Sequence, residues 1–391
     1  MAHIRKIMTA LMIIIIFMSG FMTGSFYTSH MKDKKTVMKH HLAPESEKSL
    51  PGKKMPESAS SKVVMGYVQD FRNPDLINVR NLTHVIFSFA HPSEDGDVLL
   101  NGDMAWENLR KTVRLAHENG SKVILSVGGW YHLNGEESYP YFKKAISNLD
   151  SRKKLVESLI NIADQENLDG IDIDFEHPRT EADAANLAAF MKELSVKLHG
   201  QKKELSVAVN SKINAITGAE VESVIFKPEM FHFADYVNIM AYDGQWDGGY
   251  HAENLAPYHF TENVVHYWSR LFNSLEIPKS KLVLGVPLYA QPENINAKQI
   301  SYATIISKNP DFANKDMIIL NGTAYFYNGQ KTVRKKTALA LSNGFGGMML
   351  WEAGHDGEGN TSMAKSIRSA INDHSHNSIN IHSQKKTRRE R

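Results

Sequence analysis

The amino-acid sequence predicts an α/β fold, a (β/α)8 TIM barrel, from two observations. Between about residues 62 and 372, eight short runs of β-branched and apolar residues alternate with amphipathic helical patterns, the element count of such a barrel. A doubly wound sheet is the alternative, but no GxGxxG turn follows the first predicted strand. We therefore expect a closed barrel whose chemistry lies at the carboxyl ends of its strands.

Each predicted strand is a short apolar or β-branched run, and the last residues of several runs are polar or aromatic. Helical spacing of apolar residues is clearest in two stretches between strands, 105–120 and 181–200. The predicted strands, in chain order, are 63–68, 83–90, 122–129, 170–176, 204–210, 234–243, 281–290 and 345–353.

One segment departs from the simple alternation, between the seventh and eighth predicted strands. Residues 291–330 contain short strand-like pieces and two turn signals, Asn321-Gly322 and Asn328-Gly329. We expect a small α+β-like insertion here, over the carboxyl-terminal face of the barrel, where a long connection helps to shape a binding cleft.

The composition limits the classes of function. The chain has 391 residues, 42% hydrophobic and 23% charged, with a formal net charge of +2. This near-neutral balance argues against nucleic-acid binding. The chain has no cysteine, which excludes disulfides and thiolate metal sites, and most of the clustered histidines lie in the tails; we expect no metal and no cofactor. One large domain with ample core, acting as a monomer, is the expected form.

The two ends of the chain differ in composition from the predicted barrel. Residues 1–26 combine Arg5 and Lys6 with an apolar run, which indicates a signal peptide or an uncleaved membrane anchor. Residues 27–61 are typical of a flexible polar linker, and residues 373–391 of a disordered basic tail. The folded domain should span residues 62–372, and the protein should be secreted or tethered to the outer side of a membrane.

The most informative stretch is LDGIDIDFEHP, which begins at Leu168. Asp172, Asp174 and Glu176 occupy every second position, so in a strand they share one face, while the apolar residues between them share the other. An exposed edge strand would explain the acids alone, but the apolar face implies a strand covered by helices. Crowded carboxylates disfavour ionisation of one another, so one of them can act as a general acid near neutral pH.

Other strand ends add groups that suit a sugar. The third strand ends in SVGGW, with Ser126, Gly129 and Trp130; the sixth ends in MAYD, with Met240, Tyr242 and Asp243; and the eighth contains Trp351. Sugar rings stack on aromatic side chains while their hydroxyl groups bond to acids. Trp130 and Trp246 are equally consistent with ordinary packing, and for Tyr67 and Tyr289 a core position is at least as consistent; only Tyr289 is retained as a binding candidate.

Together these motifs resemble glycoside hydrolase family 18, the chitinases and related endo-β-N-acetylglucosaminidases. DGIDIDFE resembles the DGxDxDxE signature, SVGG the SxGG element and MAYD the MxYD element, while GVPLYA and Trp351 fit the last two strands. The resemblance runs from GYVQDF to WEAGHD, essentially the whole predicted domain. Four motifs occur in the expected order on the expected strands.

The resemblance implies a substrate and a role for each residue. The substrate would be chitin or N-acetylglucosamine oligosaccharides, and the N-acetyl carbonyl of the substrate would act as the nucleophile, giving an oxazolinium intermediate and retention. Glu176 would protonate the glycosidic oxygen, Asp174 would orient the acetamido group, and Asp172 would hold the proton that lets Asp174 turn. Tyr242 would bond the acetamido carbonyl. Asp243 and Trp351 would contact the distorted sugar, with Met240 and Ser126 supporting the acids.

Three departures from the family pattern and two alternative functions remain. Phe175 stands where Trp or Tyr is commoner, Ala290 stands where Gly is commoner, and the insertion is short, which indicates an open cleft. An enzyme of the same mechanism acting on N-glycans or peptidoglycan would need the same catalytic residues. A chitin-binding lectin on the same barrel usually lacks the acid Glu or its Asp partner, and this chain keeps both.

Overall fold

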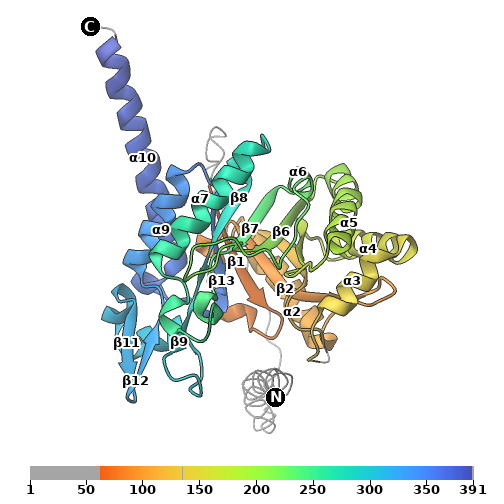
Figure 1. Ribbon diagram of the computed structural model, residues 1–391, viewed down its shortest axis with the longest axis horizontal. Helices are drawn as coiled ribbons and strands as arrows, with labels where there is room; N and C mark the ends of the chain where they lie inside the picture. The colour runs from red at the N-terminus through yellow and green to blue at the C-terminus, as the bar shows by residue number, and fades with distance from the viewer. Residues whose placement is uncertain (1–61, 134, 390–391) are drawn as a thin grey trace, which may run out of the picture. The chain divides into compact units, whose positions relative to one another are not determined.

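The computed structural model describes residues 62–133 and 135–389, with side chains as far as 376 (Figure 1). The predicted leader and linker, residues 1–61, lie outside the described residues. Within the described part of the chain, no helix is both long and apolar enough to cross a membrane.

Eight parallel strands form the closed barrel that the sequence predicted (Figure 1). Each strand pairs with its neighbours in parallel register, and β1 closes the barrel by pairing with both β2 and β13. A two-residue strand, β3 (Val98–Leu99), pairs in antiparallel register with the end of β2. The barrel strands are β1 (Val63–Gln69), β2 (His84–Pro92), β4 (Lys122–Gly128), β5 (Gly170–Asp174), β6 (Glu204–Asn210), β7 (Tyr236–Met240), β8 (Leu282–Pro287) and β13 (Gly347–Trp351).

Side-chain alternation along each strand separates two apolar clusters. On β1, Met65 and Tyr67 belong to the cluster inside the barrel, whereas Val64 and Val68 belong to the larger cluster between the strands and the helices. Burial on both faces explains why the strands have near-continuous apolar sequences.

The helix α5 begins with a capping box between Thr180 and Asp183, in which each side chain accepts a hydrogen bond from the backbone N–H of the other residue.

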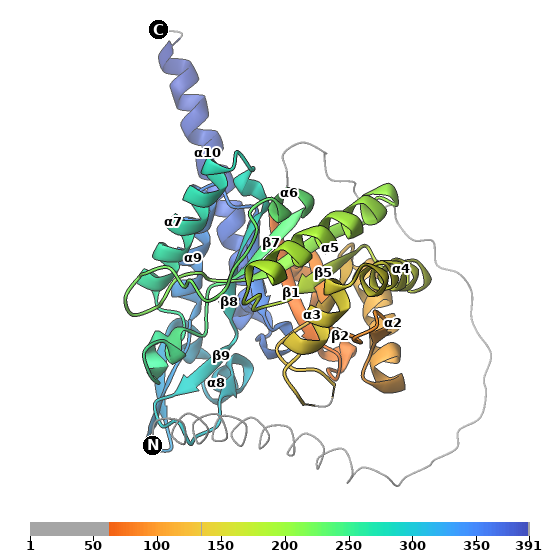
Figure 2. The same ribbon diagram turned by 45° about the vertical axis from the view of Figure 1, so that its right-hand side comes forward.

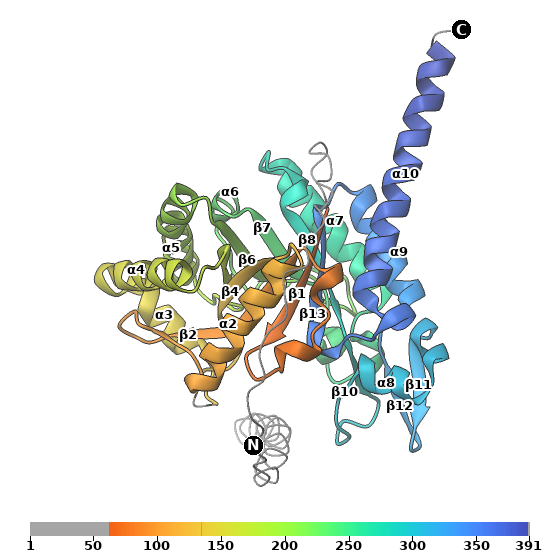
Figure 3. The same ribbon diagram turned by 180° about the vertical axis from the view of Figure 1, so that it is seen from behind.

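The helices lie around the outside of the barrel, as Figures 1 and 3 show from opposite sides. They are α2 (Gly102–Glu118), α3 (Tyr139–Ser147), α4 (Leu149–Gln165), α5 (Glu181–Gly200), α6 (Met230–Phe233), α7 (Tyr258–Ser274), α8 (Tyr302–Lys308), α9 (Gln330–Ser342) and α10 (Met363–Arg389). Short 3-10 helices are η1 (Pro74–Leu76), η2 (Val79–Asn81), η3 (Gly244–Trp246), η4 (Ala252–Asn254), η5 (Lys279–Lys281), η6 (Pro310–Asn314), η7 (Ala353–His355) and η8 (Gly359–Thr361).

The last helix differs from the sequence-based expectation. The sequence predicted a disordered tail from residue 373, but α10 continues to Arg389. The stretch from Met363 onward contains neither Gly nor Pro, so no residue in it interrupts the helical backbone.

The insertion between the seventh and eighth barrel strands forms a separate small sheet (Figure 2). Its four strands pair in antiparallel register. Asn321 and Gly322 form the tight turn between Leu320 and Thr323, and both have the positive φ that a two-residue hairpin turn favours. The strands are β9 (Tyr289–Pro292), β10 (Ile300–Ser301), β11 (Met317–Leu320) and β12 (Thr323–Phe326), and α8 and η6 lie between β10 and β11.

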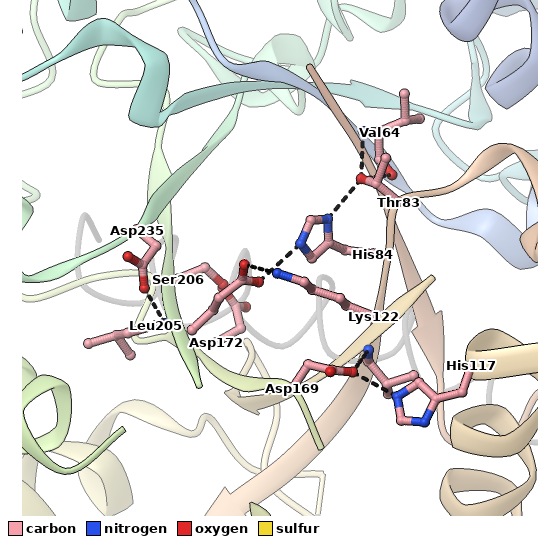
Figure 4. A network of polar contacts seen from close by, with 12 residues as sticks. Val64, Thr83, His84, His117, Lys122, Asp169, Asp172, Leu205, Ser206 and Asp235 are labelled. Carbon is pink, nitrogen blue, oxygen red and sulfur yellow. Dashed lines mark hydrogen bonds and ion pairs between the residues drawn. The ribbon is translucent and has the colours of Figure 1, made fainter. Parts of the chain in front are cut away.

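Ionic and polar pairs gather at the amino-terminal ends of the barrel strands (Figure 4). His84 Nε2 lies 3.0 Å from Glu204 Oε2, and Lys122 forms an ion pair with the same carboxylate. Asp169 and Asp235, each just before a strand, accept the backbone N–H of a residue on a neighbouring strand and pair with His117 and His199. These contacts fix the strand starts relative to one another.

Burial acts to raise the pKa of Glu204, but the hydrogen bonds and charges of His84 and Lys122 outweigh it, and the pKa lies below its usual value. A lowered carboxyl pKa contributes stability above the unfolded pKa, which is lost as the pH falls through the folded pKa. Glu204→Gln should therefore reduce the free energy of unfolding at pH 7 by about 1–3 kcal/mol.

Denaturant unfolding of Glu204→Gln at pH 7 and near pH 3 would test this. The difference from the wild type should shrink at the lower pH, where the wild-type carboxyl is also protonated. Glu181→Gln, which removes an exposed carboxylate paired with Lys227, is the matched control and should have little effect. An equal loss from Glu204→Gln at both pH values would contradict the assignment.

Candidate active site

The acidic stretch forms β5 and the turn that follows it, and its alternation is as predicted. Ile171 and Ile173 belong to the cluster under the helices, while Asp172 and Asp174 are buried on the inner side of the barrel. Glu176 follows the strand at its carboxyl end and remains partly exposed, so the three acids extend from the interior to the surface of the barrel.

Asp172 is held by hydrogen bonds from four other barrel strands. Its Oδ2 accepts from the Tyr67 hydroxyl at 2.9 Å and from Ser126 Oγ at 2.8 Å. Its Oδ1 accepts from Ser206 Oγ at 2.5 Å and from Asn238 Nδ2 at 3.3 Å. Figure 4 shows Ser206 beside this carboxylate.

Asp174 lies in a different environment from Asp172. Its Oδ1 is buried and has no hydrogen-bond partner among the described residues. Burial, the charge of Glu176 and the charge of Asp172 all raise the pKa of Asp174 well above its usual value. A carboxyl group in this setting holds its proton to a higher pH than an exposed one does.

Glu176 borders a small concave region at the end of the barrel. Burial raises the pKa of Glu176 to about 8, assisted by the charges of Asp243 and Glu137. His177 Nδ1 lies 3.7 Å from Glu176 Oε2 and has an edge-to-face contact with Trp130. The region is lined by Gly129, Trp130, Glu137, Ser138, Tyr139, Phe175, Glu176 and His177.

The two glycines after β4 allow this close arrangement. Gly128 has φ +122°, and a Cβ atom there would lie 2.2 Å from the backbone oxygen of Asp174. Gly129 N donates to that same oxygen at 2.9 Å, so the turn is fastened to β5 beside the acids. Only glycine fits at the first of these positions.

The end of β7 carries the second predicted group. Tyr242 is buried in the inner cluster, and burial followed by the charges of Asp243, Asp174, Glu176 and Asp172 raises the pKa of its hydroxyl well above its usual value. Met240 is partly buried against the same cluster. Asp243, which is exposed, accepts a hydrogen bond from the Tyr289 hydroxyl at 2.5 Å. The structure therefore brings these four residues to the same end of the barrel as the acids.

Trp351 ends β13 and is only partly buried. Its ring lies 5.8 Å from that of Phe89 in a stacked arrangement and 5.4 Å from that of Tyr67 edge to face. Arg72, in the loop after β1, contacts Glu352 and lies 2.6 Å from His355 Nε2, which joins the loops beside this ring. Trp351 is thus held from one side, with part of its surface left free.

Trp130 and Trp246, which the sequence left undecided, are both 43% exposed, so neither is a core residue. From the sequence, Tyr67 is expected in the core, and Ser206, Asn238 and His177 are not singled out. Tyr67, Ser206 and Asn238 lie at inward-facing positions of strands. A search for polar side chains at such positions would have found Ser206 and Asn238. No group of three or more metal-ligating side chains occurs among the described residues.

Comparison with known proteins supports the assignment of the fold and family. The family described as Glycosyl hydrolases family 18 matches residues 63–356. The chain belongs to glycosyl hydrolase family 18. Among solved structures, the family 18 chitinase ChiB from the chitin utilization locus of Flavobacterium johnsoniae superposes with a TM-score of 0.66 at 24% identity, covering 81% of this chain and 95% of that one.

Two curated relatives place the chain among chitinase-like members of family 18. A probable chitinase 10 of Drosophila melanogaster is 27% identical over 242 residues, 56% of this chain, and the chain spans only 10% of that relative's length. A chitinase-like effector of Moniliophthora roreri is 26% identical over 291 residues, covering 67% of each chain.

The raised pKa of Glu176 predicts a stabilising substitution. A carboxyl group whose folded pKa is about 8, against an ordinary value of 4.5, favours folding fully only below about pH 4.5, and this contribution is lost as the pH rises toward 8. Glu176→Gln should therefore raise the melting temperature at pH 8 by several degrees and have little effect near pH 4.

Thermal unfolding of both proteins across this pH range would measure the effect. Glu157→Gln, at an exposed position on α4, is the control and should follow the wild type at every pH. If Glu176→Gln were no more stable than the wild type at pH 8, the carboxyl group would not be kept protonated by the fold.

Proposed function

We propose that the protein hydrolyses β-1,4 glycosidic bonds of chitin or N-acetylglucosamine oligosaccharides with retention of configuration. The observation that carries this proposal is the pair formed by Glu176 and Asp174. Glu176 is a partly exposed acid with a pKa of about 8, and Asp174 behind it is a buried acid whose Oδ1 has no hydrogen-bond partner among the described residues. A glycosidase needs one carboxyl group that is still protonated near neutral pH to assist the leaving oxygen.

In this mechanism the acetamido group of the substrate attacks its own anomeric carbon. Glu176 transfers its proton to the glycosidic oxygen as the bond breaks, and an oxazolinium ion forms. Glu176 then removes a proton from the water that opens this ring, which returns the acid to its starting form. Asp174 orients the acetamido nitrogen and stabilises its positive charge, with Asp172 behind it, and Tyr242 donates a hydrogen bond to the acetamido oxygen.

The remaining predicted residues would bind and position the sugars. The free surface of Trp351 suits an apolar sugar face, and exposed Trp130 offers a second platform beside Glu176. Asp243 would accept from a sugar hydroxyl, held in place by Tyr289. Met240 packs behind the site, Ser126 orients Asp172, and Gly129 allows the close approach of the loop.

Two alternatives share parts of this proposal. An endo-β-N-acetylglucosaminidase acting on N-glycans or peptidoglycan would use the same acids with different sugar-binding loops. A chitin-binding lectin would use the aromatic platforms without the acids, but the raised pKa of Glu176 gives it the property of a general acid, which binding alone does not require.

We propose further that residues 1–26 direct export, as a signal peptide or as an anchor facing the outside, and that residues 27–61 link them to the catalytic barrel. An extracellular monomer would meet chitin or its fragments directly.

Hydrolysis of chitin oligosaccharides, with products separated by length and anomer, tests the activity. The wild type should release β-anomeric products, and Glu176→Gln should lower kcat by about a thousandfold because it cannot donate a proton. Glu181→Gln, on the first turn of α5, is the control and should keep wild-type activity. If the folded wild type left every oligomer intact, chitin would be the wrong substrate, and N-glycan and peptidoglycan fragments would be tested next.

The pH dependence of kcat/KM tests the electrostatics of the acid. The alkaline limb should lie near pH 8, where free Glu176 loses its proton. Because the charge of Glu137 helps to raise the pKa of Glu176, Glu137→Gln should move this limb to lower pH. Glu136→Gln, at the neighbouring position, should leave it in place; an unchanged limb in Glu137→Gln would contradict the coupling.

A further inference from the structure

The carboxylate of Asp243 accepts two hydrogen bonds on the same oxygen. The Tyr289 hydroxyl donates to Oδ1 at 2.5 Å, and the side-chain amide of Gln245 donates to the same Oδ1 at 3.0 Å. The other oxygen, Oδ2, has no hydrogen-bond partner among the described residues, and Asp243 keeps an exposed surface. The protein therefore holds one oxygen of this carboxylate and leaves the other available to a ligand.

Gln245 is the less expected of the two donors. It lies two residues after Asp243, in η3, and its side chain is fully buried. Asp243 has φ +65°, a left-handed backbone conformation that is uncommon for a residue other than glycine. The chain turns back at this residue, which brings the Gln245 amide to the carboxylate while the next residue, Trp246, stays exposed.

Contacts of the surrounding loop fix this turn. The backbone N–H of His251 donates to the backbone oxygen of Gln245 at 2.8 Å. At Gly244, a Cβ atom would lie 2.6 Å from the backbone oxygen of Asn254, so a larger residue would force the turn open. The Gln245 side chain therefore has little freedom to move away from Asp243.

The orientation of the Gln245 amide indicates that its partner is a charged carboxylate. Its Oε1 atom is buried and has no hydrogen-bond partner among the described residues. Leaving a buried acceptor unpaired costs free energy, and this cost is best offset when the amide N–H donates to an anion. A protonated Oδ1 on Asp243 would favour the reversed amide, because Oε1 could then accept that proton.

The charge of Asp243 is stabilised by neutral donors alone. Among the described residues no cation pairs with it, and the titratable groups that face it are Tyr242, Tyr289 and Glu176. Desolvation by the neighbouring side chains raises the pKa of Asp243, and the hydrogen bonds of Tyr289 and Gln245 oppose that rise. Of the charges that raise the pKa of Glu176, that of Asp243 has the largest effect.

We propose that Gln245 is a positioning residue that fixes the carboxylate of Asp243, so that protein donors occupy Oδ1 and only Oδ2 accepts a hydroxyl group of the bound sugar. The inference rests on the proposed function for the identity of the ligand. Gln245 is buried and acts through Asp243 without touching the sugar. Because it stabilises the charge of Asp243, it also helps the neighbouring Glu176 to keep its proton.

The charge of Asp243 can be followed without any activity. In protein labelled with 13C at the aspartate side-chain carboxyls, the Asp243 resonance is assigned by its loss in Asp243→Asn. Gln245→Met removes the donor and keeps a side chain of similar length, so the pH at which this resonance titrates should rise. An unchanged titration would overturn the proposal, whether or not the protein cleaves chitin.

Kinetics with chitin oligosaccharides separate a positioning role from a structural one. Gln245→Met should lower kcat/KM about tenfold and move its acid limb to higher pH, because Asp243 is then protonated, and lost as an acceptor, at a higher pH. In an Asp243→Asn background the same substitution should have almost no further effect. An equal loss in both backgrounds, with the acid limb in place, would show that Gln245 is merely structural.

Gln330→Met is the matched control. The Gln330 amide also donates two hydrogen bonds, but to the backbone oxygens of Asn360 and Ser362. Its loss should leave the Asp243 titration and the pH profile of kcat/KM unchanged.

If Gln245→Met did not fold, a crystal structure of Glu176→Gln with a bound N-acetylglucosamine tetramer would decide the question. A sugar hydroxyl should lie within hydrogen-bond distance of Oδ2 of Asp243, and the Gln245 amide should remain on Oδ1. A sugar hydroxyl on Oδ1 would refute the inference. A wild type inert toward chitin oligosaccharides would refute the proposed function, while the Asp243 titration would judge this inference separately.

Discussion

The burial of neighbouring carboxylates inside a packed barrel is the constraint on which the rest of the site depends. Charged groups removed from water need donors, cations or protons. Asp172 receives donors from β1, β4, β6 and β7, so those strands must carry small hydroxyl, phenol or amide groups at the matching level. Asp174 has no donor to its buried Oδ1 among the described residues, and its pKa is raised well above its usual value. One strand thus determines the chemical character of positions on four others.

Carboxylates at the two ends of the barrel have different partners. At the amino-terminal ends of the strands, Glu204, Asp169 and Asp235 are each paired with a histidine, and Glu204 also with a lysine. At the carboxyl end, Asp172 and Asp174 have no cationic partner among the described residues, and Glu176 has only a neighbouring imidazole at 3.7 Å. Charges are paired at one end of the barrel, while at the other end the carboxyl groups of Asp174 and Glu176 have raised pKa values.

The sequence was sufficient to predict the barrel and those site residues that belong to a recognisable pattern within one strand. The alternation in β5 predicts which side chains face inward, because it depends only on the period of a strand. Ser206 and Asn238 were missed because a lone serine or asparagine in a strand carries no information about its partner across the barrel. Tyr67, weighed as a core residue, is buried in the inner cluster and also donates to Asp172. The exposure of Trp130 and Trp246 depends on loop conformations that residue spacing does not encode. The roles assigned to the site residues remain predictions that the experiments above address.

Closure of the barrel joins its first and last strands, which are far apart in the sequence. Val63 on β1 pairs with Gly347 on β13, and Lys62 Nζ donates to the backbone oxygen of Phe345 at 2.7 Å. β1, the first strand of the described residues, therefore has one edge without its barrel partner until β13 has been synthesised. The pairing of β1 with β13 therefore has a large sequence separation, and contacts of this kind slow folding because a long loop must close before they form.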